Sequence, residues 1–310
     1  MKRPTQARAF APASIGNVAV GFDMLGHSVQ GPGDIATVRL TKDRLVRVTA
    51  IRGVVADLPT DARENTAGRA LIGLAKLRKG VGFEVELDKG IPLGSGMGGS
   101  AASAVAALVA ANALLDEPVP LETLYDLAID GESAASGSRH GDNVAPMLLG
   151  GLVIAPASGT PVRVPVPGNL YCTLVHPHFV LETRKARAAL KGAYELHDFV
   201  VQSEGLALLL AGCWAKDFEL IRRGFRDVLV EPRRAGLIPG FGRVKEAALD
   251  AGALGASISG GGPSVFAWFD SKPKAQAAGA AMAEAFRSVK LGADVLVSKV
   301  AGPGARVLGR

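Results

Sequence analysis

The chain of 310 residues has only two cysteines, Cys172 and Cys213. Their spacing matches no zinc or redox motif, which excludes a cysteine-based metal site and a disulfide framework. We therefore expect two free thiols in a reducing, cytoplasmic environment. No apolar run follows Met1-Lys2-Arg3, so no signal peptide is expected.

Aromatic residues are also scarce, at 5% of the chain. The formal net charge is +6, but the basic residues stand singly or in pairs. Proteins that bind nucleic acids combine basic runs with aromatic side chains, so this class is disfavoured. The longest apolar run, over 101–115, is alanine-rich and too short to cross a bilayer. We expect neither nucleic acid nor a membrane as a partner.

Glycine, in contrast, is abundant, with 39 residues that form clusters. Between these clusters the hydrophobic periodicity predicts strands and helices in mixed order, which favours an α+β fold over a doubly wound parallel sheet. The predicted strands lie over 35–40, 45–51, 81–88, 170–175, 255–258, 265–269 and 293–300. The predicted helices lie over 66 to about 80, 101–115, 121–135, 183–192, 197–213, 216–228, 241–251 and 274–288, and 144–154 is predicted as a loop leading into a strand. Four prolines over 156–168 predict a boundary between domains 1–160 and 161–310.

The densest glycine cluster joins the predicted strand 81–88 to the predicted helix 101–115. Glycines let backbone N–H groups approach a phosphate, and the helix N-terminus adds about half a positive charge. Ser95, Ser100 and Ser103 supply hydroxyls, one of which could reach a phosphate-bound Mg²⁺. The segment is therefore predicted to be a phosphate-binding loop.

The loop also matches other glycine-rich motifs in part. Gly94, Gly96 and Gly99 match the dinucleotide fingerprint G-x-G-x-x-G, but another predicted helix stands where that motif needs a second strand and an acidic residue. The same glycines fit the start of a Walker P-loop, whose lysine is absent. An ordinary glycine-rich turn rarely needs so many glycines and serines. A nicotinamide-dependent oxidoreductase remains the alternative from a different class.

The loop resembles the phosphate loop P-x-x-x-G-L-G-S-S-A of the GHMP kinase superfamily. Met97 stands in place of the leucine, which is a change between apolar residues of similar size. Gly99 stands in place of the first serine and removes one hydroxyl. By this resemblance the ATP-binding residues are Pro92, Leu93, Gly94, Ser95, Gly96, Met97, Gly98, Gly99, Ser100, Ala101 and Ala102.

Four further segments narrow the resemblance to the homoserine kinase family. They are residues 11–26, 140–146, 231–241 and 257–263, and with the loop they follow the family's order along nearly the whole chain. Many GHMP kinases carry a lysine in the first of these motifs. Here Ser14 occupies that region, which disfavours a mevalonate kinase or a galactokinase.

The resemblance implies the two-domain GHMP kinase α+β fold. Its N-terminal domain would be like ribosomal protein S5 domain 2, its C-terminal domain would be ferredoxin-like, and the active site would lie between them. The implied activity is ATP-dependent phosphorylation of the hydroxyl of L-homoserine in threonine biosynthesis, with Mg²⁺, by a homodimer. A second glycine-rich turn, 259–262, is expected between two strands and beside the phosphate loop. A related GHMP kinase acting on another alcohol is the nearest alternative.

The same resemblance implies the roles of individual site residues. Ser100 and Glu132 would bind Mg²⁺. The substrate-binding residues would be Asn17, Asp23, His140, Asn143, Arg187 and Arg234, and the catalytic ones Asp23, Asn143 and Arg187. Arginine pairs bidentately with carboxylates, so Arg187 and Arg234 are expected to hold the α-carboxylate, although Arg233 could replace its neighbour. Asp142 could serve as a general base, but phosphoryl transfer depends mainly on positioning and charge.

Overall fold

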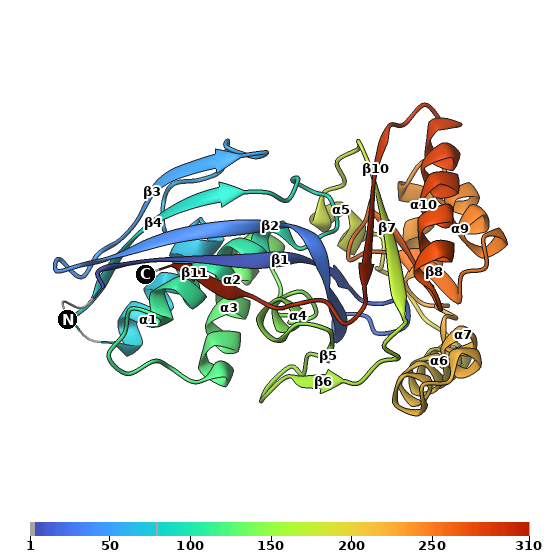
Figure 1. Cartoon of the computed structure of the whole chain (residues 1–310), viewed down its shortest axis with the longest axis horizontal. Helices are drawn as coiled ribbons and strands as arrows, with labels where there is room; N and C mark the ends of the chain where they lie inside the picture. Colours follow the sequence, from blue (N-terminus) through green and yellow to red (C-terminus); the bar gives the residue numbers. More distant parts are fainter. Residues whose placement is uncertain (1–3, 79, 310) are drawn as a thin grey trace.

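Two β-sheets, each covered by helices, organise the chain (Figure 1). The computed structural model describes residues 4–78 and 80–309. The alternation of apolar and polar residues in the sequence is visible in strand β4 (Gly82–Lys89), where Phe83, Val85 and Leu87 are buried and the residues between them are partly exposed. One face of this strand therefore packs on the core.

The first sheet combines strands from the N-terminal half with strands that return from later in the chain. It contains β1 (Gln6–Gly16), β2 (Leu25–Thr41), β3 (Val46–Gly53), β4, β5 (Leu152–Ile154), β6 (Val162–Val164) and β11 (Arg306–Gly309). The main path runs β11-β1-β2-β4-β3, and β5 pairs with β2 and β6. β3 and β4 are parallel, because helix α1 (Thr66–Leu77) carries the chain back between them, and the other pairs are antiparallel.

Helices α1, α2 (Gly99–Asn112), α3 (Leu121–Ser136) and α4 (Val144–Leu149) lie on one face of the first sheet (Figure 1). α1 begins after Asn65, whose side chain accepts hydrogen bonds from the amides of Ala67 and Gly68. α2 is buried around most of its circumference, and its many alanines let the sheet, α1 and α3 pack closely around it. The N-terminus of this central helix is the end of the predicted phosphate loop.

The second sheet has the order β10-β7-β9-β8, and all its pairs are antiparallel. Its strands are β7 (Tyr171–Pro177), β8 (Gly255–Ile258), β9 (Val265–Phe269) and β10 (Ala293–Lys299). α9 (Phe241–Asp250) and α10 (Lys272–Arg287) pack against it. The remaining helices are α5 (Thr183–Ala188), α6 (Leu196–Ala215), α7 (Phe218–Gly224), α8 (Glu231–Arg234) and the 3₁₀ turn Ala235–Leu237. This arrangement is the predicted ferredoxin-like half of an α+β protein.

One fully buried histidine joins the two sheets. Trp268 of β9 donates a hydrogen bond from Nε1 to Nε2 of His27 in β2, at 3.2 Å. Nδ1 of His27 therefore carries the proton and donates to the carbonyl of Ser28, at 2.9 Å. Burial lowers the pKa of His27 to about 4. The hydrogen bond to Ser28 raises this pKa, but its effect is smaller than that of burial. The neutral imidazole is thus part of the packing between the two sheets.

Several local expectations differ from the structure. Residues 144–154 were expected to lead into a strand as a loop, but Val144–Leu149 form helix α4, and only Leu152–Ile154 form the strand. The predicted helices 183–192 and 216–228 are shorter, as Thr183–Ala188 and Phe218–Gly224. β1 was not predicted, because its alanines have low strand propensity and Pro12 interrupts it. The register shifts between Pro12 and Ser14, where a bulge accommodates the proline.

The predicted division of the chain at residue 160 stays a prediction. β6 and β11 both follow that position in the chain and both pair within the first sheet. Sheet membership is decided by pairing with strands far away in sequence, which proline and glycine content does not encode.

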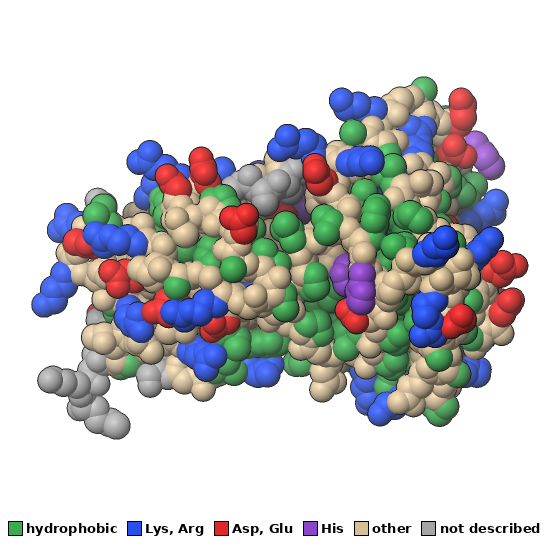
Figure 2. All heavy atoms as spheres, turned by 90° about the horizontal axis from the view of Figure 1, so that it is seen from above, with side chains coloured by type: hydrophobic (Ala, Val, Ile, Leu, Met, Phe, Trp, Pro, Cys, Tyr) green, Lys and Arg blue, Asp and Glu red, His purple; other side chains and the backbone are tan. Residues whose placement is uncertain are grey.

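The surface carries both signs of charge. On the face shown in Figure 2, Lys and Arg side chains are interspersed with Asp and Glu. Cys172 and Cys213 are free and buried, as expected. Within 4–78 and 80–309, no helix combines the length and apolar character that a bilayer crossing requires.

Candidate active site

A cavity of about 610 Å³ lies between the two halves of the chain. This volume is in the range of small-molecule sites. The N-terminal half contributes the predicted phosphate loop and the segment around Asn17 and Asp23, and the other half contributes α5, Arg234 and the turn at Gly260. The two glycine-rich segments predicted from the sequence therefore face the same cavity.

Four carbonyl groups of the phosphate loop accept hydrogen bonds from other segments of the chain. Leu181 N donates to Gly94 O at 3.2 Å, and Ser14 N donates to Met97 O at 3.2 Å. The hydroxyl groups of the second glycine-rich turn do the same: Ser264 Oγ donates to Ser95 O at 2.6 Å and Ser259 Oγ to Gly96 O at 2.7 Å. These four hydrogen bonds join the loop to the second glycine-rich turn and to the segments around Ser14 and Leu181. The expected position of the 259–262 turn beside the loop is confirmed.

Gly96 and Gly98 in the loop cannot be replaced without strain. Gly96 and Gly98 have left-handed φ values of 76° and 72°. A Cβ atom at Gly98 would lie 2.8 Å from Ser14 Oγ and 2.9 Å from Asn143 Oδ1. A Cβ atom at Gly96 would lie 2.5 Å from the carbonyl oxygen of Ser259. Close approach of neighbouring segments therefore requires both glycines.

The amide groups of this loop are available to a ligand. Within the described part of the chain, the amides of residues 96–101 meet no acceptor. The first N–H groups of a helix have no partner in a preceding turn, and the dipole of α2 adds positive potential there. Ser100, in the first turn of α2, donates from Oγ to Glu132 Oε1 at 3.1 Å. The Ser100 hydroxyl and the buried Glu132 carboxylate thus lie together at the end of the loop whose amides meet no acceptor.

A lysine missed by the sequence analysis lies under this helix N-terminus. The buried Lys89 Nζ donates to the carbonyl of Gly99 and to Ser103 Oγ, both at 2.7 Å, and forms a buried ion pair with Asp34. Asp34 also accepts from Ser103 Oγ at 2.8 Å and from the Gly90 amide at 3.0 Å. Lys89 directly precedes the glycine-rich segment. A cation beside a predicted phosphate loop is the sequence signal that could have identified this residue.

The segment 17–23 has a strained backbone. Asn17, Val18, Ala19 and Asp23 all have left-handed φ values, of 70°, 39°, 58° and 59°. This conformation is costly for a β-branched residue such as Val18 and is typical of functional sites. Asn17 holds the segment: its amide donates to Asp142 Oδ2 at 3.0 Å, its Nδ2 donates to Gly260 O at 2.8 Å, and its Oδ1 accepts from the amide of Asp23 at 3.0 Å.

Asp23 at the end of this segment pairs with Arg187 on α5. Two hydrogen bonds, of 3.0 and 2.9 Å, join the guanidinium to the carboxylate. The bond to Asp23 raises the pKa of Arg187, against the effect of burial. Arg187 Nε is buried and has no hydrogen-bond partner in the described part of the chain. The two bonds to Asp23 use only two of the five N–H donors of this guanidinium.

His140, Asp142 and Asn143 form a hydrogen-bonded cluster on the same wall. Asp142 Oδ1 is 3.1 Å from His140 Nδ1 and accepts from Asn143 Nδ2 at 3.3 Å. Asn143 Oδ1 accepts from Ser14 Oγ at 2.8 Å. Burial alone would lower the pKa of His140, but Asp142, with the charges of Glu132 and Asp23, outweighs it and raises that pKa to about 8. His140 Nε2 is buried and has no partner within the described residues.

These side chains include a group that could hold a metal ion. Ligand atoms of Asp23, His140 and Asp142 lie within 4.8 Å of one another. However, Arg187 already neutralises Asp23, and Asp142 accepts three hydrogen bonds. The pair Ser100 and Glu132 is better suited to Mg²⁺, because it offers two oxygen ligands beside the amides that would hold phosphate.

Of two adjacent arginines, only Arg234 lines the cavity. It is buried, and its Nε and one terminal nitrogen donate to the carbonyls of Ala186 and Gly260, at 3.1 and 2.9 Å. Burial, and then the charge of Arg187, lower its pKa. Arg233 instead packs over the ring of Tyr194 at 3.8 Å and donates to the carbonyl of Lys191 at 3.0 Å.

Comparison with known proteins gives the family. The model for the GHMP kinases N terminal domain matches residues 65–151, and the model for the GHMP kinases C terminal matches residues 206–288. The homoserine kinases of Xanthomonas campestris pv. campestris (strain B100) and Xylella fastidiosa (strain M12) are 58% and 56% identical to this chain, over 98% of it and 94% of their own length. The crystal structure of homoserine kinase from Cytophaga hutchinsonii matches with a TM-score of 0.93 at 44% identity, covering 99% of both chains. The chain belongs to the homoserine kinases of the GHMP kinase family.

Membership of this family confirms the resemblance and the two-domain α+β fold predicted from the sequence. GHMP kinases use ATP, which agrees with a loop that lines the cavity and whose amides meet no acceptor among the described residues. The dinucleotide interpretation of the loop is wrong: α2 is followed by α3, and the second parallel strand that this fingerprint needs is missing from the topology of the described residues.

In this homoserine kinase family member, most predicted site residues line one cavity. They are Asn17, Asp23, Pro92, Leu93, Gly94, Ser95, Gly96, Gly98, Gly99, Ser100, Glu132, His140, Asn143, Arg187 and Arg234. Met97, Ala101 and Ala102 do not line it, because their side chains are buried in the core. Among the other residues that line the cavity, Thr66, Lys89, Glu182, Thr183 and Arg184 were not predicted as site residues.

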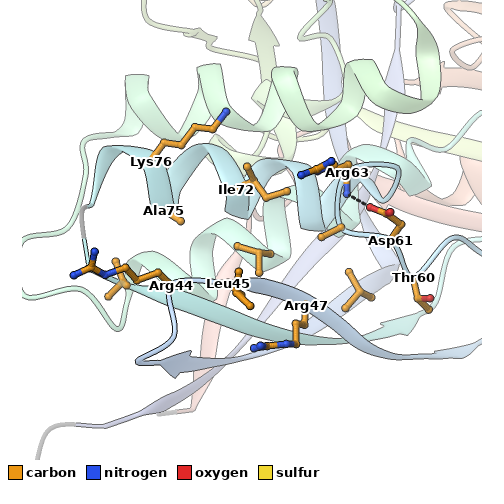
Figure 3. Close-up of a pocket in the computed structure, with 14 residues that line it drawn as sticks. Arg44, Leu45, Arg47, Thr60, Asp61, Arg63, Ile72, Ala75 and Lys76 are labelled. Carbon is orange, nitrogen blue, oxygen red and sulfur yellow. Dashed lines mark hydrogen bonds between the residues drawn. The ribbon is translucent and has the colours of Figure 1, made fainter.

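A second hollow, of about 880 Å³, lies between α1 and β3 (Figure 3). It contains four cationic residues, Arg44, Arg47, Arg63 and Lys76, but none of the predicted site residues. Figure 3 shows that the charged ends of Arg44, Arg47 and Lys76 point in different directions and meet at no common centre. The cavity between the two halves is therefore the candidate active site of this kinase.

Proposed function

We propose that this chain transfers the γ-phosphoryl group of ATP to the side-chain hydroxyl of L-homoserine, giving O-phospho-L-homoserine for threonine biosynthesis. The observation that carries the proposal is the placement of the Asp23–Arg187 pair in the same cavity as the phosphate loop. One site thus offers an anion and a cation for a zwitterionic amino acid, next to a group of amides for phosphates.

The amino acid would be bound by exchange of partners. Its ammonium would form an ion pair with the carboxylate of Asp23, and its carboxylate would form one with the guanidinium of Arg187. Arg234 would add positive charge beside that carboxylate. Both arginines lie near the ring of Phe22, at 5.5 and 5.3 Å from its centroid. The unpartnered Nε atoms of Arg187 and His140 would donate to the polar atoms of the substrate, and Asn17 and Asn143 would fix the shape of this subsite.

ATP would be held by the phosphate loop, residues 92–102. The amides of residues 96–101 and the dipole of α2 would bind its phosphates. Met97, Ala101 and Ala102 would contribute only through the backbone, since their side chains are buried. Lys89 would fix the helix N-terminus through the Gly99 carbonyl.

Ser100 and Glu132 would hold Mg²⁺, which prefers few protein oxygens with phosphates and water. The 3.1 Å contact between their oxygen atoms supports this pairing, because two oxygens so close together could bind one ion. When bound, Mg²⁺ neutralises charge that develops on the transferred phosphoryl group.

In the reaction, the homoserine hydroxyl oxygen attacks the γ-phosphorus, a new P–O bond forms, and the bond to the β,γ-bridging oxygen breaks, so that ADP leaves. The hydroxyl proton passes to a phosphoryl oxygen or to solvent. A dedicated base is not required, because phosphoryl transfer with a loose transition state depends on positioning and charge. With a pKa of about 8, His140 is mostly cationic at neutral pH and cannot accept this proton. Asp142 already accepts three hydrogen bonds and serves to orient His140, Asn143 and Asn17.

Release of ADP tests the activity, measured with Mg-ATP and either homoserine, mevalonate, galactose or shikimate. We expect turnover with homoserine alone, because only an amino acid matches Asp23 and Arg187 together. Turnover with another alcohol and none with homoserine would assign the chain to a different substrate within the GHMP kinases.

The homodimer and the cytoplasmic location also remain proposals. Leu196, Phe199 and Val200, near the start of α6, are half or more exposed, and a second copy of the chain would cover such a surface. Two free, buried thiols suit a reducing compartment. Light scattering coupled to size-exclusion chromatography tests the dimer.

A further inference from the structure

We propose that Gln202 on α6 is a positioning residue for the amino-acid substrate. It does not line the cavity, but its side-chain amide joins the two segments that carry Asp23 and Arg234. The proposal rests on the function proposed above and adds a residue outside the cavity that sets the geometry of the substrate site.

The amide of Gln202 makes one hydrogen bond in each direction. Its Nε2 donates to the carbonyl of Val20 at 3.3 Å, and its Oε1 accepts from the amide of Val228 at 2.9 Å. A carbonyl on one side and an N–H on the other leave only one orientation of the side chain. Gln202 is only 8% exposed, and its bond to Val20 is buried, whereas the bond to Val228 is partly buried. A buried amide is costly unless both of its ends are paired.

Val20 belongs to the strained segment 17–23, in which Val18 has a φ of 39°. Strain of this kind persists only where the surroundings hold the backbone. α6 supplies that support at two places one turn apart: Gln202 binds the carbonyl of Val20, and Gly205 packs against its side chain. A Cβ atom at Gly205 would lie 3.0 Å from Val20 Cγ1. α6 therefore fixes Val20, three residues before Asp23.

On its other side, Gln202 fixes the start of the segment that carries Arg234. Next to Val228, the carboxylate of Asp227 accepts hydrogen bonds from the amides of Leu229, Val230 and Glu231, at 2.9–3.0 Å. The amide of Arg234 then donates to the Val230 carbonyl at 3.2 Å. One tight turn thus connects Val228 to Arg234, so a shift of Val228 would also move Arg234.

A displacement of either segment would change the distance between Asp23 and the two guanidinium groups. That distance decides whether a zwitterion of the size of homoserine fits. The phosphate loop is held by other residues, Ser14, Leu181, Ser259 and Ser264, and none of these bonds involves α6. Loss of Gln202 should therefore affect the amino acid and leave ATP binding unchanged.

Steady-state kinetics of three variants with homoserine and ATP test the proposal. Gln202→Leu removes both bonds and should raise the KM for homoserine about tenfold, because the segments that carry Asp23 and Arg234 lose their common support. Gln202→Glu keeps an acceptor for Val228 but sets an oxygen against the Val20 carbonyl, so it should raise this KM as well. The KM for ATP should stay within about twofold of wild type. Ser203→Leu, at the exposed neighbouring position of α6, is the matched control and should resemble wild type.

An unchanged KM for homoserine in Gln202→Leu would overturn the proposal, and so would an equal rise of both KM values, which indicates a general structural defect. A wild-type KM in Gln202→Glu would overturn the link to Val20. If the wild-type protein fails to phosphorylate homoserine, the proposed function fails, and hydrogen exchange then tests Gln202 separately. Peptides covering 17–24 should exchange faster in Gln202→Leu than in Ser203→Leu, and equal rates would overturn the proposal.

Discussion

Arg187 and Asp23 stand 164 positions apart in the sequence and are joined by two hydrogen bonds of 3.0 and 2.9 Å. They come from different halves of the chain, so this ion pair closes one side of the cavity across the boundary between the halves. A zwitterionic substrate can replace the pair without leaving either charge uncompensated. In the binding mode proposed above, the binding of the amino acid would depend on the relative position of the two halves.

Asp23→Asn removes the negative charge and keeps the shape of the side chain. We expect kcat/KM for homoserine to fall about 100-fold or more, because a charge pair in a partly buried site is worth roughly 2–5 kcal/mol. The KM for ATP should change little. Asp250→Asn, at an exposed position at the end of α9, is the control and should match wild type. A variant of Asp23 with normal kcat/KM would remove this residue from the substrate site.

The neighbouring arginines provide a matched pair for mutagenesis. Arg234→Ala should raise the KM for homoserine about 10- to 100-fold, because the buried guanidinium lines the cavity. Arg233→Ala should leave it unchanged, since Arg233 packs on Tyr194 outside the cavity. Steady-state kinetics at saturating ATP measure both. If Arg233→Ala had the larger effect, the assignment of the carboxylate anchor would be reversed.

Glu132→Ala removes the carboxylate that faces Ser100. We expect kcat to fall about 100-fold or more, with partial recovery as the Mg²⁺ concentration rises, since one of the proposed ligands is lost. Glu122→Ala, at an exposed position of the same helix, controls for changes in α3. Titration of the activity with Mg²⁺ is the measurement. A kcat loss with an unchanged Mg²⁺ dependence would argue against a role in metal binding.

Much of this site could be predicted because its chemistry is local in sequence. The loop 92–102 carries its glycines and serines consecutively, and the strand before it and the helix after it define its orientation. Arg234 could not be separated from Arg233 by sequence. That choice depends on which guanidinium reaches the carbonyls of Ala186 and Gly260, a property of tertiary packing.

Other features were out of reach because they depend on long-range partners. In the sequence, Asp34 and Lys89 resemble ordinary strand residues. Only the pairing of their strands in the sheet brings both beside the N-terminus of α2. The left-handed backbone of Val18 contradicts its local preference and exists because Asn17 and α6 hold the segment. Sequence periodicity describes the faces of single helices and strands, and it does not show which residues of different elements come together.

The pKa of His140 predicts a pH dependence of substrate binding. Below about pH 8 His140 is cationic and both ring nitrogens carry a proton, so Nδ1 donates to Asp142 and Nε2 can donate to the substrate. In the neutral form the proton stays on Nδ1, beside Asp142, and Nε2 loses its donor. We expect kcat/KM for homoserine to decrease as the pH rises through about 8. In Asp142→Asn the residue that raises this pKa loses its charge, so the decrease should begin at lower pH. His140→Gln should lack this inflection and serves as the control for titration of the substrate itself. A wild-type profile identical to that of His140→Gln would contradict the assignment.

The stability of the fold should depend on pH through His27, whose pKa in the folded state is lowered from 6.5 to about 4. In the unfolded chain this imidazole binds a proton near pH 6.5, whereas in the folded chain burial and the hydrogen bond that Nε2 accepts from Trp268 favour the neutral form. Its contribution to stability is therefore complete above about pH 6.5 and is lost as the pH falls toward 4. For one proton the free energy of unfolding should decrease by about 1.4 kcal/mol per pH unit in this window. Urea denaturation between pH 7.5 and pH 5, where few carboxylates are protonated, measures this slope. His27→Gln should be less stable at every pH but should lose the His27 part of the slope, whereas His178→Gln, at an exposed position, should keep it. Equal slopes in wild type and His27→Gln would show that this histidine is not the group that titrates.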